Sequence, residues 1–201
     1  MNITIFINKK YIENTYGMND DLLNRFTVEV FPNLLNRLSM DLRVKSIHIF
    51  TSDLKKSDLG FGSKINLHQV DSTGIDKYSE LIELSLNKSD YQDEYMVIYN
   101  PMFPFISINK IHDAYQQVRS GKYTSAIGVD KNYSTKINMS NIEFFDAGIF
   151  SIFGVRNFKA NKKRLISPVY LTQLNALELI TLRETDDYEL YGLVVNAGLT
   201  Q

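Results

Sequence analysis

The chain lacks cysteine altogether, which excludes a disulfide framework and any reaction that depends on a thiolate. It also lacks a basic excess, because 22 lysine and arginine residues stand against 23 aspartate and glutamate residues and give a net charge of −1. Proteins that bind nucleic acid usually carry a clear excess or stripe of positive charge. We therefore expect no nucleic-acid partner.

Long apolar runs are absent as well. No stretch approaches the roughly 18 apolar residues of a membrane-spanning helix, and residues 1–7 carry neither the basic segment nor the cleavage site of a secretory signal. The sequence therefore predicts a cytoplasmic protein with no membrane partner. What the chain does have is 44% hydrophobic residues in a length of 201, which is enough for a sizeable core. We expect one domain over residues 1–201.

The stretch from Tyr95 to Val129 is the most informative one. Its first five residues form a short apolar run, typical of a buried strand. Pro101 and Pro104 then prevent both a continued strand and an immediate helix. Apolar residues at helical spacing follow Ser107, which is placed to cap a helix, and a second apolar run closes the stretch. The pattern predicts a strand–helix–strand unit whose first turn lies where open α/β sheets bind ligands.

The same alternation extends over the rest of the chain. Further strands are expected at residues 2–7, 44–50, 64–67, 144–153 and 168–171. Helices are expected at about residues 27–42, 75–86 and 181–196, with a basic surface helix or loop at 155–164 and a polar loop at 8–18. Together these elements predict an α/β fold with a mostly parallel sheet and helices on both faces.

Three short motifs occur in a familiar order. Residues 99–105 read Tyr-Asn-Pro-Met-Phe-Pro-Phe, residues 146–150 read Asp-Ala-Gly-Ile-Phe, and residues 187–190 read Asp-Tyr-Glu-Leu. In this order the chain resembles the cytidylyltransferases that activate acidic nine-carbon sugars, the sialic and pseudaminic acids, as CMP-sugars. The resemblance implies a Rossmann-like nucleotidyltransferase domain of the GT-A type, CTP and Mg²⁺ as reactants, and a homodimer.

The reaction of that family sets requirements for the site. A sugar hydroxyl attacks the α-phosphorus of CTP and pyrophosphate leaves, so a metal ion and cationic or backbone donors must neutralise negative charge. The resemblance implies Asp146 and Asp187 as catalytic residues and Asp186 with Asp187 as ligands of Mg²⁺. Acidic residues in the first turn of a helix are, however, also ordinary partners of the helix dipole, which leaves a structural role open for the pair near the C-terminus.

Two further groups of residues stand where the family binds its substrates. Asn8, Lys9 and Lys10 follow the first strand, at the place of the phosphate loop, and Asp53 ends a Thr-Ser-Asp turn after the second strand. We expect these four residues to bind nucleotide. Lysines in a polar segment are also commonly just solvated, and the aspartate also suits an Asx turn.

The proline-bracketed turn supplies the residues expected to bind the sugar, Asn100 and Phe103. Asparagine before proline is also common turn chemistry, so a structural role stays open here too.

The sequence departs from the family where the chemistry takes place. It has no glycine after the first strand until Gly17, and Thr181 and Arg183 stand where the family has two metal-binding aspartates. Two hypotheses follow from these replacements. The chain is either a cytidylyltransferase with substitute phosphate and metal ligands, or a non-catalytic relative that serves as a binding or assembly partner.

Overall fold

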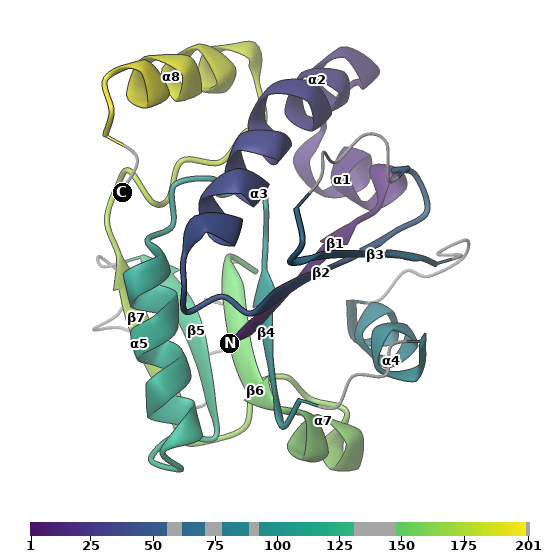
Figure 1. Cartoon of the computed structure of the whole chain (residues 1–201), viewed down its shortest axis with the longest axis vertical. Helices are drawn as coiled ribbons and strands as arrows, with labels where there is room; N and C mark the ends of the chain where they lie inside the picture. Colours follow the sequence, from purple (N-terminus) through teal and green to yellow (C-terminus); the bar gives the residue numbers. More distant parts are fainter. Residues whose placement is uncertain (56–61, 71–77, 89–92, 131–147, 200–201) are drawn as a thin grey trace.

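A single seven-stranded sheet organises the molecule, with the strand order β3-β2-β1-β4-β6-β5-β7 (Figure 1). The structure, a computed structural model, describes residues 1–55, 62–70, 78–88, 93–130 and 148–199. The strands are β1 (Asn2–Ile7), β2 (Ser46–Thr51), β3 (Ile65–Gln69), β4 (Tyr95–Tyr99), β5 (Ser125–Asp130), β6 (Phe150–Gly154) and β7 (Val169–Leu174). All paired strands are parallel except that β6 runs antiparallel to both β4 and β5. The predicted α/β fold with a mostly parallel sheet is therefore confirmed.

Strand β1 lies where the strand order reverses. It pairs with β2 on one side, from Asn2 opposite Ser46 to Ile7 opposite Thr51, and with β4 on the other side. The chain passes from β1 outward to β2 and β3, and returns to the opposite side of β1 as β4. Such a switch point opens a crevice at the carboxyl ends of the strands, which is the usual ligand position in open α/β sheets.

Helices cover both faces of this sheet, as the sequence predicts (Figure 1). They are α1 (Lys9–Tyr16), α2 (Asp20–Arg25), a π-helical turn η1 (Phe26–Val30), α3 (Phe31–Met40), α4 (Tyr78–Lys88), α5 (Ile108–Arg119), α7 (Val155–Asn161) and α8 (Thr185–Asn196). Within the described residues, no helix has both the length and the apolar character that a membrane span requires.

Side chains alternate between the two faces of the sheet along each strand, and a separate hydrophobic core lies on each face. In β4, Val97 and Tyr99 face the larger core, which includes buried residues of α3, α5 and α8. Their neighbours Met96 and Ile98 face the opposite way and join a smaller core with residues of α4 and α7. Because successive residues of a strand point to opposite faces, one continuous apolar run can fill both cores.

The segment 8–18, expected to form a loop, is the helix α1. Asn8 caps it by accepting the backbone N–H of Tyr11 on Oδ1 at 2.9 Å, and Gly17 ends it with a φ of 68°. The expectation of a loop is wrong because the lysines that suggested it lie in the first turn of a helix with a proper cap at each end.

The helix expected at 27–42 also begins earlier and is not uniform. Asn19 caps α2 at residue 20, and the five-residue turn η1 joins α2 to α3. Pro32 is the second residue of α3, just after this turn. Proline has no N–H and its ring crowds the carbonyl four residues earlier, which accounts for a widened turn at this point.

Gly128 in β5 lies where the sheet leaves no room for a side chain. A Cβ there would meet Phe150 Cε1 at 2.8 Å and Leu174 Cδ1 at 2.9 Å. We expect Gly128→Val to destabilise the protein by about 1–3 kcal/mol through overpacking. Gly192→Ala is the control, because Gly192 lies in α8 with nothing within 4 Å of its Cβ position. This change should stabilise the protein by up to about 1 kcal/mol.

Urea unfolding measures the stability of both variants. If Gly128→Val were as stable as the wild type, the close packing of Phe150 and Leu174 around Gly128 would be contradicted.

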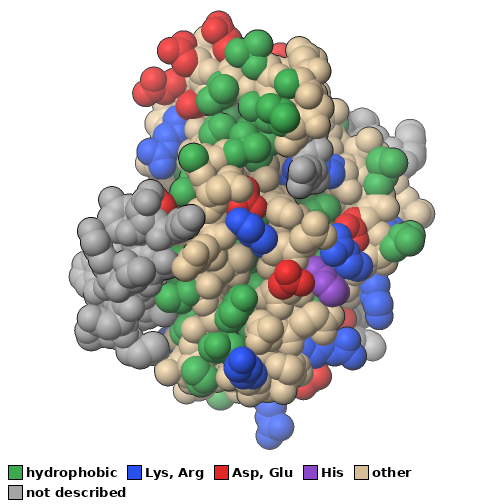
Figure 2. Space-filling model, turned by 90° about the vertical axis from the view of Figure 1, so that its left-hand side faces the viewer, with side chains coloured by type: hydrophobic (Ala, Val, Ile, Leu, Met, Phe, Trp, Pro, Cys, Tyr) green, Lys and Arg blue, Asp and Glu red, His purple; other side chains and the backbone are tan. Residues whose placement is uncertain are grey.

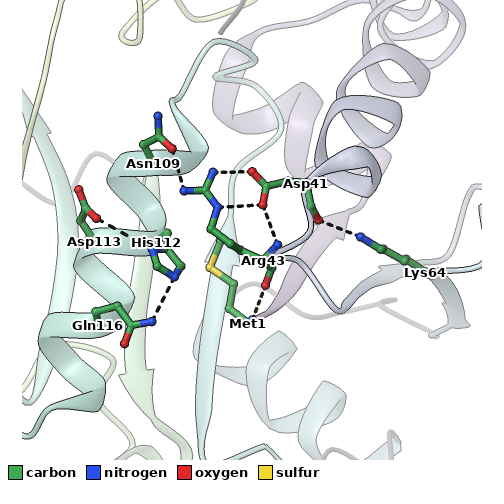
Figure 3. A network of polar contacts seen from close by, with 8 residues as sticks. All are labelled: Met1, Asp41, Arg43, Lys64, Asn109, His112, Asp113 and Gln116. Atoms are coloured by element: carbon green, nitrogen blue, oxygen red, sulfur yellow. Dashed lines mark hydrogen bonds and ion pairs between the residues drawn. The ribbon is translucent and has the colours of Figure 1, made fainter.

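A polar network closes the amino-terminal edge of the sheet (Figure 3). The amino group of Met1 donates to the carbonyl of Arg43 at 2.7 Å, and the Arg43 side chain donates to Asp41 and to Oδ1 of Asn109 in α5. Lys64 Nζ donates to the carbonyl of Asp41 at 2.8 Å. The network thereby joins β1, α5, the α3–β2 connection and the approach to β3.

The Asp41 carboxylate gives this network a pH dependence. Hydrogen bonds from the Arg43 side chain lower the pKa of Asp41 from 3.8 to about 2. Because the folded-state pKa is depressed, the stabilisation is complete above the unfolded value near 4 and is lost as the pH falls toward 2. We expect Asp41→Asn to cost about 1 kcal/mol at neutral pH and almost nothing near pH 2, measured by urea unfolding.

The control for this prediction is Asp113→Asn, which changes an exposed carboxylate of the same region (Figure 3). Its effect should be small across the same pH range. An Asp41→Asn deficit of the same size at both pH extremes would show that the carboxylate charge is not involved.

Candidate functional site

A cavity of about 670 Å³, here called the Lys9 cavity, lies in the crevice at the carboxyl ends of β1 and β2. Its walls are apolar side chains of Ile7, Leu23, Val28, Pro32 and Leu54, and its polar residues are Lys9, Asp20, Asn24, Thr27 and Asp53. A volume of this size suits a small organic ligand such as a nucleoside.

The cation of this cavity is already paired within the protein. Lys9 Nζ lies 2.6 Å from Oδ1 of Asp20 in α2 and 3.7 Å from Oε1 of Glu13. The hydrogen bond to Asp20 raises the pKa of Lys9. The lysine therefore stays positively charged, and two carboxylates of the same chain compete with any ligand for its ammonium group.

The first backbone N–H of α1 is also bound to a carboxylate of the same chain. Lys9 donates its backbone N–H to Oδ2 of Asp53 at 2.7 Å. Thr51 holds the turn that carries this carboxylate, since its Oγ1 accepts the backbone N–H groups of Asp53 and Leu54 at 3.0 and 3.2 Å. The Asp53 carboxylate thus lies at the N-terminus of α1, where the backbone N–H groups would otherwise bind an anionic ligand.

A second cavity of about 290 Å³ lies on the other side of α1, and we call it the Asn100 cavity. Asn100 donates from Nδ2 to the hydroxyl of Tyr16 at 2.6 Å and to the carbonyl of Gly148 at 2.9 Å. Its Oδ1 accepts the backbone N–H of Met102 at 3.1 Å. These contacts join the end of α1, the proline-bracketed turn and the approach to β6, so Asn100 holds the cavity together.

Two other residues of the turn and of α1 complete this arrangement. Phe103 is only 5% exposed and belongs to the core, where its carbonyl accepts the hydroxyl of Tyr99 at 2.7 Å. Burial raises the pKa of Tyr16, while the hydrogen bond from Asn100 and the nearby Arg183 act in the opposite direction. Tyr16 is therefore a neutral hydrogen-bonding group at physiological pH.

The sequence pattern missed a cation of the Asn100 cavity. Arg164 follows α7 in the basic segment expected on the surface, yet it lines this cavity and donates from Nη1 to Oγ of Ser151 at 3.3 Å. Arg183 also reaches the crevice, with its guanidinium carbon 5.8 Å from the centre of the Tyr16 ring. No local signal separates Arg164 from its basic neighbours, because only the tertiary fold returns the chain to this edge.

The pair predicted to bind Mg²⁺ lies at the start of α8. Asp187 accepts the backbone N–H groups of Arg183 and Glu184 on Oδ2, each at 2.8 Å, as one half of a capping box. Asp186 is exposed beside it in the first turn. Among the residues that the structure describes, no group of three or more acidic or histidine residues could hold a metal ion. The described residues therefore do not fit Mg²⁺ at this place.

Two predicted residues cannot be placed in this way. Asp146, expected to be catalytic, lies outside the described residues, as does the side chain of Lys10.

A pair of substitutions separates a capping role from a metal-binding role. Asp187→Ala should destabilise the protein by about 1 kcal/mol, because it leaves backbone N–H groups at the start of α8 without their acceptor. Asp186→Ala should cost only a few tenths of a kcal/mol from the helix dipole. Urea unfolding in EDTA measures both. Equal losses that appear only when Mg²⁺ is added would contradict the capping role.

Comparison with known proteins tests the fold. No family model matches the sequence. A 2-C-methyl-D-erythritol 4-phosphate cytidylyltransferase from Francisella tularensis is 14% identical, with a TM-score of 0.61 over 96% of this chain and 99% of that one. The 4-diphosphocytidyl-2C-methyl-D-erythritol synthase from Anaerococcus prevotii is 12% identical, with a TM-score of 0.60 over 97% and 95%. The fold is that of a nucleotidyltransferase.

A protein from Mycobacterium sp. strain JC1 shares the same fold, with 14% identity and a TM-score of 0.62 over 97% of this chain and 98% of that one. At such low identities the likeness concerns the fold alone. It agrees with the resemblance drawn from the sequence at the level of a Rossmann-like nucleotidyltransferase fold. Two of these three neighbours are named for methylerythritol compounds and not for an acidic nine-carbon sugar.

Proposed function

We propose that this protein is a non-catalytic relative of the cytidylyltransferases that serves as a binding or assembly partner. One observation carries the proposal. In the Lys9 cavity, the ammonium group and the first backbone N–H of α1 are both bound to carboxylates of the same chain. These are the kinds of group that a triphosphate would need.

The charge around Lys9 opposes a polyanion. One ammonium group lies among the carboxylates of Glu13, Asp20 and Asp53, so the local balance is negative. A phosphate brought to Lys9 would therefore meet more like charge than opposite charge, and Coulomb repulsion between like charges grows as their separation falls. Binding of a polyanion is disfavoured here unless these carboxylates move away.

The backbone offers little compensation at the same place. In related folds, a glycine-rich loop brings several N–H groups onto the phosphates. Here the chain forms α1 directly after β1, with the Tyr11 N–H bonded to Asn8 and the Lys9 N–H bonded to Asp53. When other side chains of the same chain accept the first N–H groups of a helix, these groups are not available to bind an anionic ligand.

A second candidate function is supported by the Asn100 cavity. Its lining combines the Tyr16 hydroxyl, the Asn100 amide and the Arg164 guanidinium, which together suit a sugar that carries a carboxylate. This candidate is an active cytidylyltransferase that joins CMP to an acidic nine-carbon sugar.

Calorimetry with CTP and Mg²⁺ tests the proposal on three forms of the full chain. We expect binding by the wild type to be weaker than about 1 mM. The double variant Asp20→Asn with Asp53→Asn should bind at least about tenfold more tightly, because it removes two negative charges. Asparagine at position 53 can still accept the Lys9 N–H, so α1 should keep its place. Asp21→Asn is the matched control, since it removes an exposed charge of α2 outside the cavity lining.

A different result of the same experiment would favour the second candidate. Micromolar binding of CTP by the wild type, with magnesium-dependent release of pyrophosphate when a nonulosonic acid is added, would replace the proposal by the second candidate. In that case Arg164→Met should raise the KM for the acidic sugar more than the KM for CTP, because only the sugar would meet the Asn100 cavity.

A further inference from the structure

Two histidines join the edge strand β3 to the rest of the sheet. Among the described strands, β3 pairs only with β2 and lies at one end of the strand order (Figure 1). Nδ1 of His48 in β2 lies 3.0 Å from Nε2 of His68 in β3, which is hydrogen-bonding distance. The five residues of β3 are all exposed or half-buried, so apolar burial holds this strand less firmly than the central strands.

The two rings are placed by further contacts on the same face of the sheet. The ring of His68 stacks on Phe50 with the ring centres 4.5 Å apart. The other nitrogen of His48, Nε2, lies 2.9 Å from Oγ of Ser46. Both imidazoles are thus held in position, and the hydrogen bond between them links β2 to β3 through side chains as well as through the backbone ladder.

The surroundings of the pair keep both rings neutral at physiological pH. Thr4 of β1 and Asn66 of β3, which lie opposite His48 in the sheet, carry no charge. Burial, followed by the charge of His68, lowers the pKa of His48 below its ordinary value of 6.5, and the carboxylate of Asp93 before β4 offsets part of this shift. Burial also lowers the pKa of His68.

Protonation changes what this hydrogen bond can do. A hydrogen bond between two imidazoles needs one ring nitrogen that carries no proton. Two neutral rings meet this need, and so does an imidazolium that donates to a neutral ring. A second proton removes the acceptor and puts like charges on two rings whose facing nitrogens are 3.0 Å apart. The doubly protonated pair therefore repels.

The end of β3 is in turn connected to the crevice. The backbone N–H of Val70, just after β3, donates to the carbonyl of Thr51 at 3.0 Å, and Nε2 of Gln69 donates to the carbonyl of Leu54 at 2.5 Å. Thr51 and Leu54 flank the turn that carries Asp53, the residue that binds the first N–H of α1. Release of β3 would remove two contacts that hold this turn in place.

We propose that the His48–His68 pair is a pH-sensitive switch that holds β3 on the sheet at neutral pH and releases it, with the Asp53 turn, when both rings are protonated. The stability that the pair provides is complete above 6.5. It falls as the pH drops below that value, because the unfolded chain then binds more protons than the folded one. The inference concerns the attachment of β3 and is independent of the proposed function.

Hydrogen exchange of the full chain, followed by NMR from about pH 7.5 to about pH 5, tests the switch. We expect the protection factor of the Val70 amide to fall by at least about tenfold over this range. The imidazole signals of His48 and His68 should titrate below 6.5, and the Lys9 amide signal should shift in the same step. The amides of β4 should stay protected at both ends of the range, which shows that the rest of the sheet remains folded.

His68→Gln separates protonation from the hydrogen bond itself. A glutamine amide both donates and accepts, so it can bond to His48 whether or not that ring is protonated. In this variant the protection factor of the Val70 amide should change by about threefold or less over the same pH range, because only one titrating ring is left.

The matched control is His112→Gln, which changes the remaining histidine of the chain. His112 lies in α5, where its ring meets Gln116 and Asp113 (Figure 3). Helix α5 lies across the sheet from β3 (Figure 1), on the side that Figure 2 shows, where a histidine is visible at the surface. This variant should lose protection at Val70 like the wild type.

Two results would overturn the proposal. One is a wild type in which both imidazoles of the pair titrate while the protection factor of the Val70 amide stays constant. The other is a His68→Gln protein that loses as much protection as the wild type, because the pH dependence of β3 would then come from other groups.

Discussion

The hydrogen bond from the backbone N–H of Lys9 to the carboxylate of Asp53 joins the two strand ends that define the crevice. It ties the start of α1, directly after β1, to the turn after β2, and the Lys9 side chain extends the tie to α2 through Asp20. Because α1 is held in this position, it separates the Lys9 cavity from the Asn100 cavity and presents Tyr16 to Asn100. The geometry of the site thus depends on the Asp53 carboxylate, which accepts the first N–H of α1.

The same constraint connects the fold to the proposed loss of catalysis. A nucleotidyltransferase sheet places its ligand at the switch point beside β1, and this sheet keeps that switch point. The proposed difference lies at the start of α1, where an anionic ligand would bind. Asp53 and Asp20 supply negative charge where a triphosphate would bring its own, and Asp187 caps α8 with the carboxylate that the resemblance would give to a metal. In the proposed account, these carboxylates stabilise the chain itself at the places where a ligand or a metal ion would otherwise bind.

Much of the fold could be predicted because burial leaves a periodic trace in the sequence. The apolar run at 95–99 and the helical spacing after Ser107 appear as β4 and α5. Helix α1 was missed because it is only eight residues long and mostly polar, with two lysines at its start and Gly17 directly after its end. In the site, the sequence left a structural role open for two residues, and the structure shows that role in both cases. Asn100 accepts a backbone N–H within its turn, and Asp187 accepts a backbone N–H at the start of α8. Arg164 could not be found, since its approach to the crevice depends on long-range folding and not on its neighbours.

The central claim is that two carboxylates of this chain, those of Asp20 and Asp53, occupy the place at the start of α1 where an anionic ligand would bind. A crystal structure grown with CTP and Mg²⁺ in large excess tests it most directly. The account predicts that Lys9 Nζ stays on Asp20, that its N–H stays on Asp53, and that no triphosphate is bound beside α1. A triphosphate on Lys9, with Asp20 and Asp53 turned away, would contradict it.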